Sequence, residues 1–401
     1  MNKLTIDDIA LAGKRVLVRV DFNVPLDEEG TITDDLRIRT SLPTIRKIVE
    51  SGGRAILMSH MGRPKGKVIP ELRMTPVALR LSEYMKQEIK LAPDCVGEET
   101  RKMAMDLQDG EILLLENLRF HAEETSNDAG FAEQLAELGE VFINDAFGTA
   151  HRAHASTEGV THHISPCAAG YLMQKEIDYL GGALEHPQRP FVAVLGGAKV
   201  AGKIEIIESL LNRVDTILVG GGMSFTFLKA EGREIGDSLL EQDKLPLAEE
   251  TLRKARAAEV EILLPKDVII AREMSQDAEA QTVGIDGIEP GWKGLDIGAE
   301  TAKMFASKVK QARTVLWNGP MGVFEMDKFS QGTEIVARAL AEATENGAVT
   351  VVGGGDSAAA VSKYNLNDKV SHVSTGGGAS LEFLGGLELP GIAALTDKGS
   401  A

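Results

Sequence analysis

Basic and amide side chains follow several short apolar runs in the first half of the chain. These runs end at Val20, Met58, Leu115 and Ile143, where buried strands are predicted to end. Arginine binds carboxylate and phosphate groups through paired hydrogen bonds, and open α/β sheets bind ligands at the carboxyl ends of their strands. A single arginine is more often a surface residue, so convergence at one sheet edge is what predicts a pocket for a small, multiply charged anion. The candidates are Asp21, Asn23, Arg37, His60, Arg63, Arg119, His151 and Arg152.

A metal site is a second interpretation of part of this set. His151 and His154 are three residues apart, a spacing that could place both on one metal ion. No cysteine or glutamate completes a zinc-binding pattern around them. The anion pocket is therefore the favoured interpretation.

The second half carries glycines where the first half carries arginines. Three runs, Gly220–Gly222, Gly353–Gly355 and Gly376–Gly378, lie at predicted strand ends, and two of them are expected to precede helices. Glycine lets a backbone approach a ligand closely, and a helix N-terminus offers free N–H groups to phosphate. Tight turns alone could explain one run, whereas three favour phosphate binding. Lys199 and Lys203 are four residues apart, so they would share a face if their segment were helical. Both could supply mobile positive charge to phosphate oxygens.

Two nucleotide motifs are nearly matched in this half. Gly197–Ile204 fits the P-loop pattern except that Ile204 lacks the hydroxyl that binds Mg²⁺, so a P-loop is rejected. Gly353–Ala358 fits the dinucleotide fingerprint after a strand, but the next strand ends at Ser374–Gly376 without the acidic residue that binds ribose. Asp356 inside this loop would repel a pyrophosphate unless a cation lay between them. It is therefore a better ligand for a Mg²⁺-nucleotide than for a nicotinamide coenzyme.

The apolar runs alternate with amphipathic segments, which predicts strands and helices in alternation. Continuous apolar strands are typical of parallel sheets that are covered by helices on both faces. The predicted fold is α/β, with two doubly wound parallel-sheet domains of similar size. The expected strands are Val16–Val20, Ala55–Met58, Ile112–Leu115, Val141–Ile143, Phe191–Leu195, Thr216–Val219, Glu261–Leu264, Thr314–Trp317, Ala348–Val352 and Val370–Val373, and helices include Ala129–Leu138, Ala201–Leu211 and Glu334–Glu345.

A helix and a stiff connector are expected between the two domains. The helix is predicted over Gln174–Leu184, and the proline-containing connector over His186–Pro190. The predicted organisation is an N-terminal domain over residues 1–170, an interdomain helix and hinge over 171–190, and a C-terminal domain over 191–389. The tail 390–401 is expected to pack back on the N-terminal domain.

Composition excludes several classes of protein. The net charge of −17 argues against binding to nucleic acid or to acidic membrane surfaces. Two cysteines provide neither a disulfide framework nor a paired-cysteine metal site. The N-terminus lacks an apolar signal core, and no apolar run reaches the roughly 20 residues of a membrane span. These features predict a cytoplasmic protein with reduced thiols.

Together, the segments closely resemble the phosphoglycerate kinase family, in its short bacterial form, along the whole chain. Among the most specific are RVDFNVP (Arg19–Pro25), SHMGRP (Ser59–Pro64), NDAFGTAHRAHAS (Asn144–Ser156), WNGPMGVFE (Trp317–Glu325) and GGGDS (Gly353–Ser357). The resemblance implies reversible phosphoryl transfer between ATP and the carboxylate of 3-phosphoglycerate, giving ADP and 1,3-bisphosphoglycerate. It also implies a monomer.

The resemblance implies a role for each candidate residue. The residues of the predicted anion pocket would bind 3-phosphoglycerate. Asp356 would hold Mg²⁺, and the transferring phosphoryl group would lie near Arg37, Lys199, Gly376, Gly377 and Gly378. The implied nucleotide-binding residues are Lys199, Lys203, Gly220, Gly221, Gly294, Leu295, Asn318, Pro320, Glu325, Gly353, Gly354, Gly355, Asp356 and Ser357.

The expected chemistry needs no general base. The attacking carboxylate is already ionised at pH 7, so catalysis is expected from positioning and charge neutralisation, without a covalent intermediate. Hinge closure is expected to bring the two substrates into line and to exclude water. Two other hypotheses are a nicotinamide-dependent dehydrogenase, suggested by the glycine fingerprint, and a two-domain solute-binding protein, which would require export.

Overall fold

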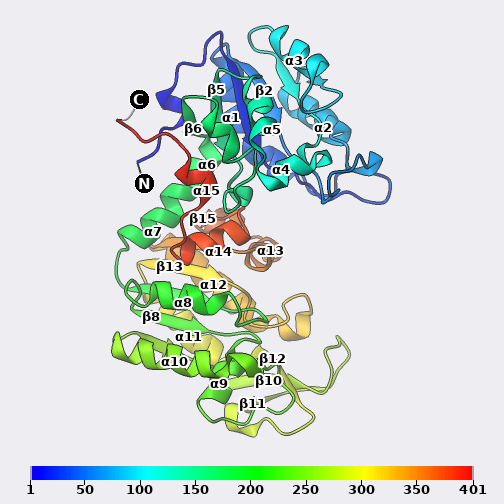
Figure 1. The fold of residues 1–401 in the computed structure, drawn as a ribbon. Coiled ribbons are helices and arrows are strands. Elements are labelled where there is room, and N and C mark those ends of the chain that lie inside the picture. Colours follow the sequence, from blue (N-terminus) through cyan, green and yellow to red (C-terminus); the bar gives the residue numbers. More distant parts are fainter. Residues whose placement is uncertain (1, 400–401) are drawn as a thin grey trace. The chain divides into compact units, whose positions relative to one another are not determined.

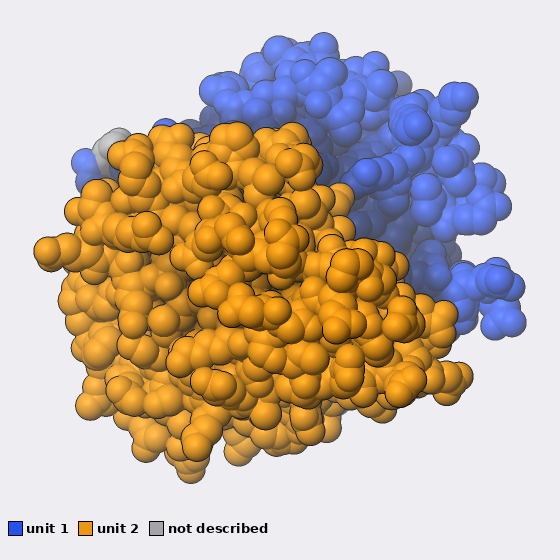
Figure 2. Space-filling view, turned by 90° about the horizontal axis from the view of Figure 1, so that it is seen from below, with its two compact units in different colours: residues 1–178, 388–401 blue, residues 179–387 orange. Residues whose placement is uncertain are grey.

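The computed structural model describes residues 2–399, which divide into two compact units (Figure 2). Unit 1 contains the chain up to Asp178 and again from Glu388 onward, and unit 2 contains Tyr179–Leu387. The division after Asp178 lies within the segment 171–190 that the sequence analysis assigns to the connection. Which ligand each unit binds stays a prediction.

Unit 1 is built on a parallel sheet of six strands in the order β3-β4-β2-β1-β5-β6 (Figure 1). The central strand β1 pairs with β2 and β5, so that Val16 lies between Ala55 and Val141. Apolar strands with helical crossovers produce this arrangement because both faces of the sheet must be covered. The strands are β1 (Arg15–Val20), β2 (Arg54–Met58), β3 (Ile89–Leu91), β4 (Ile112–Leu114), β5 (Val141–Asp145) and β6 (Cys167–Ala169).

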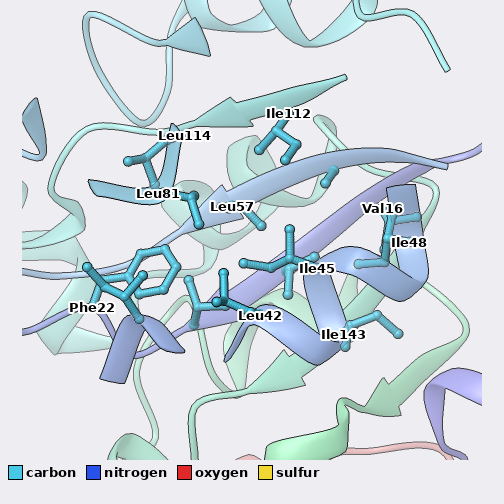
Figure 3. Packing of buried hydrophobic residues seen from close by; sticks show 14 of the residues in the cluster. Val16, Phe22, Leu42, Ile45, Ile48, Leu57, Leu81, Ile112, Leu114 and Ile143 are labelled. Carbon is cyan, nitrogen blue, oxygen red and sulfur yellow. The ribbon is translucent and has the colours of Figure 1, made fainter. Parts of the chain in front are cut away.

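Helices cover the sheet of unit 1 through apolar stripes. On α1, Leu42, Ile45 and Ile48 recur at helical spacing and pack into the same buried cluster as Val16 (Figure 3). Alternation along β1 places Leu17 and Arg19 on the opposite face from Val16. The helices of unit 1 are α1 (Leu36–Glu50), α2 (Thr75–Met85), α3 (Glu98–Met105), α4 (Ala122–Ser126), α5 (Ala129–Ala136), α6 (Tyr171–Glu176) and α15 (Pro390–Ala393).

The C-terminal segment makes its backbone hydrogen bonds within unit 1. Thr396 accepts from the amide of Leu4 at 2.8 Å and donates to Cys167 at 3.0 Å. Gly391 donates its amide to the carbonyl of Ala150 at 2.9 Å. These bonds tie the segment to the edge of the sheet, while residues 400 and 401 of the predicted tail lie outside the described residues.

Unit 2 repeats the doubly wound plan. Its six parallel strands have the order β15-β14-β13-β7-β8-β9 (Figure 1), so the predicted fold of two parallel α/β sheets is confirmed. The strands are β7 (Phe191–Leu195), β8 (Thr216–Val219), β9 (Glu261–Leu263), β13 (Thr314–Asn318), β14 (Val349–Gly353) and β15 (His372–Val373). The helices are α7 (Gly182–Glu185), α8 (Lys203–Leu210), α9 (Ser224–Ala230), α10 (Leu245–Ala257), α11 (Ala299–Gln311), α12 (Gln331–Glu345), α13 (Gly355–Lys363) and α14 (Gly378–Leu384).

A third sheet was not predicted. Strands β10 (Asp267–Ala271), β11 (Ala280–Gly284) and β12 (Lys293–Ile297) form an antiparallel sheet in the order β11-β10-β12. Most of β11 is exposed and polar, so it offers no apolar run to detect. The short strands β3 and β6 of unit 1 were not predicted either.

The predicted helix over Ala201–Leu211 begins later than expected. Helix α8 starts at Lys203, because Gly202 adopts a left-handed conformation with φ of 79°. Lys199 lies in the preceding non-helical segment. The condition under which Lys199 and Lys203 would share a helix face is therefore not met.

Two other expectations on helices are refined. All three triple-glycine runs, and not two, are followed by helices, namely α9, α13 and α14. The predicted interdomain helix is α6 and α7 joined by a π-helical turn over Ile177–Gly181. Among the described helices, none combines the length and apolar composition that crossing a bilayer requires.

The unit 1 core predicts a measurable loss of stability on truncation. Ile45 is fully buried on α1, so Ile45→Ala should lower the free energy of unfolding by about 2–5 kcal/mol. Urea denaturation followed by far-UV circular dichroism measures this change. The control is Leu79→Ala on α2, where the side chain is 65% exposed and the change should stay within about 0.5 kcal/mol. Equal effects of the two substitutions would contradict the assigned packing.

Candidate active site

A fully buried arginine lies beneath the polar end of the unit 1 sheet. Arg19 and Val20 are the last two residues of β1. The Nε of the buried Arg19 donates to Ser156 Oγ at 2.8 Å, and its Nη2 donates to His60 Nδ1 at 3.1 Å. It also donates to the carbonyl of Val20. Because guanidinium only donates, His60 must accept at Nδ1 and therefore carries its proton on Nε2. This residue was not among the predicted site residues, although an arginine inside a strand buried on both faces is itself a signal.

One buried carboxylate balances this positive charge. Glu124 on α4 is fully buried and accepts from the amide of Ser156 at 3.0 Å and from its hydroxyl at 2.7 Å. Burial lowers the pKa of Arg19, and attraction by Glu124 and Asp21 opposes that shift. The sequence alone does not reveal this connection between Arg19, Ser156 and Glu124, because they come from three separate segments.

Asn117 holds two predicted ligand-binding loops together. Its buried side chain accepts from the amides of Met61 and Arg119, both at 3.1 Å, and donates to the carbonyls of Met61 at 2.8 Å and Leu72 at 2.9 Å. These four bonds use both lone pairs and both N–H donors of the side-chain amide in a dry environment. The loop after β2 and the turn Leu118–Phe120 are therefore fixed to one another.

Gly62 connects Asn23 and Arg119. Its amide donates to Asn23 Oδ1 at 2.8 Å, and its carbonyl accepts from Arg119 Nη1 at 2.9 Å. Gly62 has φ of 61°, and a Cβ here would lie 2.9 Å from Leu72. Glycine is therefore favoured where these site residues meet. Nearby, Arg37 from the first turn of α1 pairs with Asp21 at 2.7 Å.

The predicted basic residues lie close enough together to repel one another, and we call the region that they form the basic edge. Burial, followed by repulsion from Arg19, Arg152 and Arg63, lowers the pKa of Arg119 to about 10. Burial, followed by repulsion from Arg19, Arg119, Arg37 and His154, lowers the pKa of His60 well below its usual value, so His60 is neutral at pH 7. The basic edge comprises Arg37, His60, Arg63, Arg119, His151 and Arg152, with Arg19 and His154 added by the structure.

His154 was considered only as a metal ligand. Burial and the charges of Arg119, Arg19 and Arg152 lower its pKa to about 4. Within residues 2–399, a single group of three potential metal ligands lies close together, and it includes neither His151 nor His154. His151 instead accepts from Arg152 at 3.1 Å. These contacts support an anion pocket rather than a metal centre at this edge.

In unit 2, several glycines serve close backbone packing. A Cβ on Gly319 would lie 2.2 Å from the carbonyl oxygen of Gly196, and one on Gly221 would lie 2.6 Å from the amide nitrogen of Gly197. Pro320 accepts from the amide of Gly197 at 2.8 Å. The ends of β7, β8 and β13 can therefore meet only without side chains. Close backbone packing is therefore sufficient to explain why these residues are glycines, without a bound ligand.

The loop after β14 lies beside the side-chain amide of Asn318, whose nitrogen makes no hydrogen bond in the described part of the chain. Lys203 Nζ donates to the backbone carbonyl of Asn318 at 3.1 Å and also to its Oδ1. Within the described residues, the buried Asn318 Nδ2 has no hydrogen-bond partner, and a Cβ on Gly353 or Gly354 would lie 3.2–3.3 Å from it. Burial lowers the pKa of Lys203 to about 8, while attraction by Asp356 opposes the shift.

A small pocket lies between the antiparallel sheet and the glycine-rich turns at the ends of the parallel strands of unit 2, here called the glycine turns. Its lining includes Gly221, Phe225, Gly294 and Leu295. A Cβ on Gly294 would lie 2.0 Å from the Phe225 ring, so this position must be glycine. Of the implied nucleotide-binding residues, Gly221, Gly294 and Leu295 thus line one pocket, whereas Gly220 packs against Met321.

A buried aspartate beside this pocket was not predicted. Asp296 accepts from the amides of Ile297 at 2.9 Å and Gly332 at 2.8 Å, which ties β12 to the first turn of α12. Burial raises its pKa to about 7. It lines the pocket next to Leu295.

The remaining predicted residues of unit 2 differ in exposure. Lys199, Glu325 and Asp356 are exposed, and Asp356 lies in the first turn of α13. Ser357 is buried and accepts from the amide of Gly319 at 2.6 Å. In the run before α14, Gly376 donates its amide to Ser374 Oγ at 3.1 Å, and Gly377 adopts φ of 48°.

Comparison with known proteins gives a consistent result. A sequence model described as phosphoglycerate kinase matches residues 6–387. The phosphoglycerate kinases of Chloroherpeton thalassium and Chlorobaculum tepidum are 60% and 59% identical over 397 residues, covering 99% of this chain and 100% of each relative.

Solved structures agree in fold and sequence. Phosphoglycerate kinase from Coxiella burnetii is 44% identical with a TM-score of 0.91, and the enzyme from Pyrococcus horikoshii is 33% identical with a TM-score of 0.79. Each comparison covers 98% of both chains. With its two doubly wound sheets and its matched sequence along almost the entire length, the chain belongs to the phosphoglycerate kinase family.

Proposed function

We propose that this chain transfers a phosphoryl group reversibly between ATP and the carboxylate of 3-phosphoglycerate. The bond from the γ-phosphorus to ADP breaks and a bond to a carboxylate oxygen forms, giving ADP and 1,3-bisphosphoglycerate. The observation that carries this proposal is the basic edge, where positive charges repel one another in a chain of net charge −17. A bound substrate with a carboxylate and a phosphate would relieve that repulsion.

In this proposal, 3-phosphoglycerate binds at the basic edge of unit 1. Arg119 stays protonated at neutral pH because its pKa of about 10 is well above 7. His60 offers an uncharged Nε2–H donor, since Arg19 occupies its Nδ1. Asp21 orients Arg37, and Asn23 is tied to Gly62. The remaining contacts are proposed for Arg63, His151 and Arg152.

The nucleotide is proposed to bind at the glycine turns of unit 2. The pocket lined by Gly221, Gly294 and Leu295 is the proposed site of the base, and it would have to widen on binding because its cavity in this structure has a volume of only about 10 Å³. Lys203 and the backbone of Gly353–Gly355 would contact phosphates, and the unpartnered Asn318 Nδ2 would gain an acceptor. Gly220, Pro320 and Ser357 support these turns, and Glu325 is proposed to bind ribose.

Asp356 is suited to the proposed role of Mg²⁺ ligand. Its carboxylate is exposed and lies in the first turn of α13, directly after the glycine loop. Mg²⁺ prefers hard oxygen ligands and is usually held by one or two carboxylates together with substrate phosphates and water. When bound, the ion would neutralise charge on the phosphates.

The proposed chemistry is in-line transfer without an enzyme nucleophile. The substrate carboxylate is already ionised at neutral pH, so the protein's task is to position both substrates and to neutralise charge on the moving group. Arg37, Lys199 and the backbone amides of Gly376–Gly378 are proposed for that task. Movement about the connection between the two units is part of the proposal, because direct transfer requires the ligands to meet.

A coupled assay tests the proposal directly. ADP formation from ATP, 3-phosphoglycerate and Mg²⁺ should be observed, with no turnover when 3-phosphoglycerate is omitted. Absence of ADP formation, together with coenzyme reduction in the presence of a hydroxyacid, would favour the dehydrogenase hypothesis instead.

Removing the proposed transition-state charges should slow catalysis. Arg37→Ala and Lys199→Ala should each lower kcat by roughly 10²–10³-fold or more, because each removes a donor to the moving phosphoryl group. Steady-state kinetics measures the change, and circular dichroism checks the fold. Arg39→Ala on the same helix is the matched control, since Arg39 pairs with Asp35 and should leave kcat almost unchanged. A near-normal kcat in Arg37→Ala would remove Arg37 from the mechanism.

Removing the proposed Mg²⁺ ligand should affect one substrate only. Asp356→Ala should weaken binding of Mg²⁺-nucleotide but spare 3-phosphoglycerate, as measured by calorimetric titration of each ligand separately. The control is Asp368→Ala, a turn residue of unit 2 outside the proposed site. Unchanged nucleotide affinity in Asp356→Ala would show that another group holds the ion.

The lowered pKa of Lys203 predicts a pH dependence of nucleotide binding. Lysine is charged below its pKa, so the ammonium is present at pH 7 and is lost as the pH rises through about 8. A bound phosphate would hold the charged form, so affinity should fall up to about tenfold between about pH 7 and pH 9. Calorimetry of ADP binding measures this fall. Lys203→Arg should abolish this pH dependence because arginine stays charged, and an equal fall in that variant would assign the effect to another group.

A further inference from the structure

Three metal-binding atoms converge outside the proposed active site. Asp94 and Cys95 lie in the loop between β3 and α3, and His121 follows the turn Leu118–Phe120. A carboxylate oxygen, the thiol sulfur and a ring nitrogen of these residues all lie within 4.8 Å of one another. No other such group of three occurs among residues 2–399. None of the three residues belongs to the proposed substrate or nucleotide sites.

The ligand atoms are held in place by surrounding contacts. Asp94 Oδ1 lies 2.7 Å from His121 Nε2 and accepts from the amide of Cys95 at 2.7 Å. The backbone carbonyl of Asp94 accepts from Thr100 at 3.0 Å, and the His121 ring stacks on Phe131 with centroids 5.2 Å apart. Because these contacts already order the side chains, binding of an ion would cost little further conformational entropy.

We propose that Asp94, Cys95 and His121 form a binding site for a divalent transition-metal cation of the Zn²⁺ class. Tetrahedral Zn²⁺ has bonds of about 2.0–2.3 Å to nitrogen, oxygen and sulfur, which separates neighbouring ligand atoms by roughly 3.3–3.8 Å. In the structure the three ligand atoms lie within 4.8 Å of one another. To reach the tetrahedral geometry, the 2.7 Å distance between Asp94 Oδ1 and His121 Nε2 must lengthen and the longer distances must shorten. A set of thiolate, imidazole and carboxylate favours Zn²⁺, Co²⁺ or Cd²⁺ over Mg²⁺, which prefers oxygen alone.

The exposure of the cluster allows an ion to enter. The thiol of Cys95 is buried, whereas the side chains of Asp94 and His121 are 48% and 27% exposed. An ion held by the three residues would therefore have the sulfur on its inner side and a position for water on its outer side. A thiolate and a carboxylate together would balance the two positive charges of the ion.

A cysteine nucleophile is a less suitable interpretation of the same residues. Such a nucleophile needs a histidine that accepts the thiol proton, but His121 Nε2 is directed to Asp94. Burial also raises the pKa of the Cys95 thiol well above its usual value. A bound cation is the more direct way to use this sulfur.

Binding of Co²⁺ tests the proposal without an activity measurement. Reduced, nucleotide-free, full-length protein should bind one Co²⁺ at this site and develop a thiolate-to-cobalt charge-transfer absorption with tetrahedral ligand-field bands. Added Zn²⁺ should abolish these bands. Omitting nucleotide keeps the proposed Mg²⁺ site out of the measurement, and failure of the proposed phosphoryl transfer would leave this result unaffected.

Matched variants assign the signal to the three residues. Cys95→Ser should abolish the charge-transfer band, and His121→Gln and Asp94→Asn should each weaken Co²⁺ affinity about tenfold or more. The controls are Cys167→Ser, at the other buried thiol, and His162→Gln, whose ring pairs with Glu158 at 2.6 Å; both should retain the band.

Two results would overturn the proposal. One is the absence of a thiolate band in folded wild-type protein, and the other is a band that survives Cys95→Ser. If Cys95→Ser does not fold, as judged by circular dichroism, the more exposed His121→Gln decides the question: undiminished Co²⁺ affinity in that variant contradicts the site.

Discussion

The burial of Arg19 at the end of β1 is the constraint on which the unit 1 site depends. A charged group in a dry interior is tolerated only when it is hydrogen bonded and balanced by opposite charge. Ser156 and His60 accept from Arg19, and Glu124 bonds to Ser156 behind it. The bond from Arg19 leaves Nε2–H of His60 as the free donor, while burial, followed by repulsion from Arg19 and the other cations of the basic edge, keeps His60 neutral.

The ends of the two parallel sheets are built in different ways. Unit 1 concentrates side-chain cations and holds their loops by a buried amide, Asn117, with four hydrogen bonds. Unit 2 brings strand ends so close that a side chain on Gly221 or Gly319 would collide with neighbouring backbone. In the proposed function, backbone amides and two lysines of unit 2 would bind phosphates, which would let a chain of net charge −17 bind anionic ligands.

Apolar periodicity was sufficient to predict most long strands and both parallel sheets, because strands buried on two faces consist of continuous apolar residues. It could not predict β11, whose residues are largely exposed, or the start of α8, where the conformation of Gly202 decides the boundary. Polar residues after strands were sufficient to nominate the basic edge. Arg19 was missed because it lies inside a strand, and Glu124 because its role depends on contacts between segments far apart in the sequence. Motif likeness supplied the individual roles in unit 2, where glycines alone do not distinguish packing from ligand binding.

The central claim is that the end of the unit 1 sheet binds 3-phosphoglycerate through cations arranged around a neutral His60. An NMR titration of protein labelled at arginine and histidine side chains with 3-phosphoglycerate tests it most directly. The account predicts the largest shifts at Arg37, Arg119, Arg152 and His60, with His60 remaining neutral and protonated on Nε2 at pH 7. Shifts confined to unit 2, or a His60 that titrates near its ordinary pKa, would contradict it.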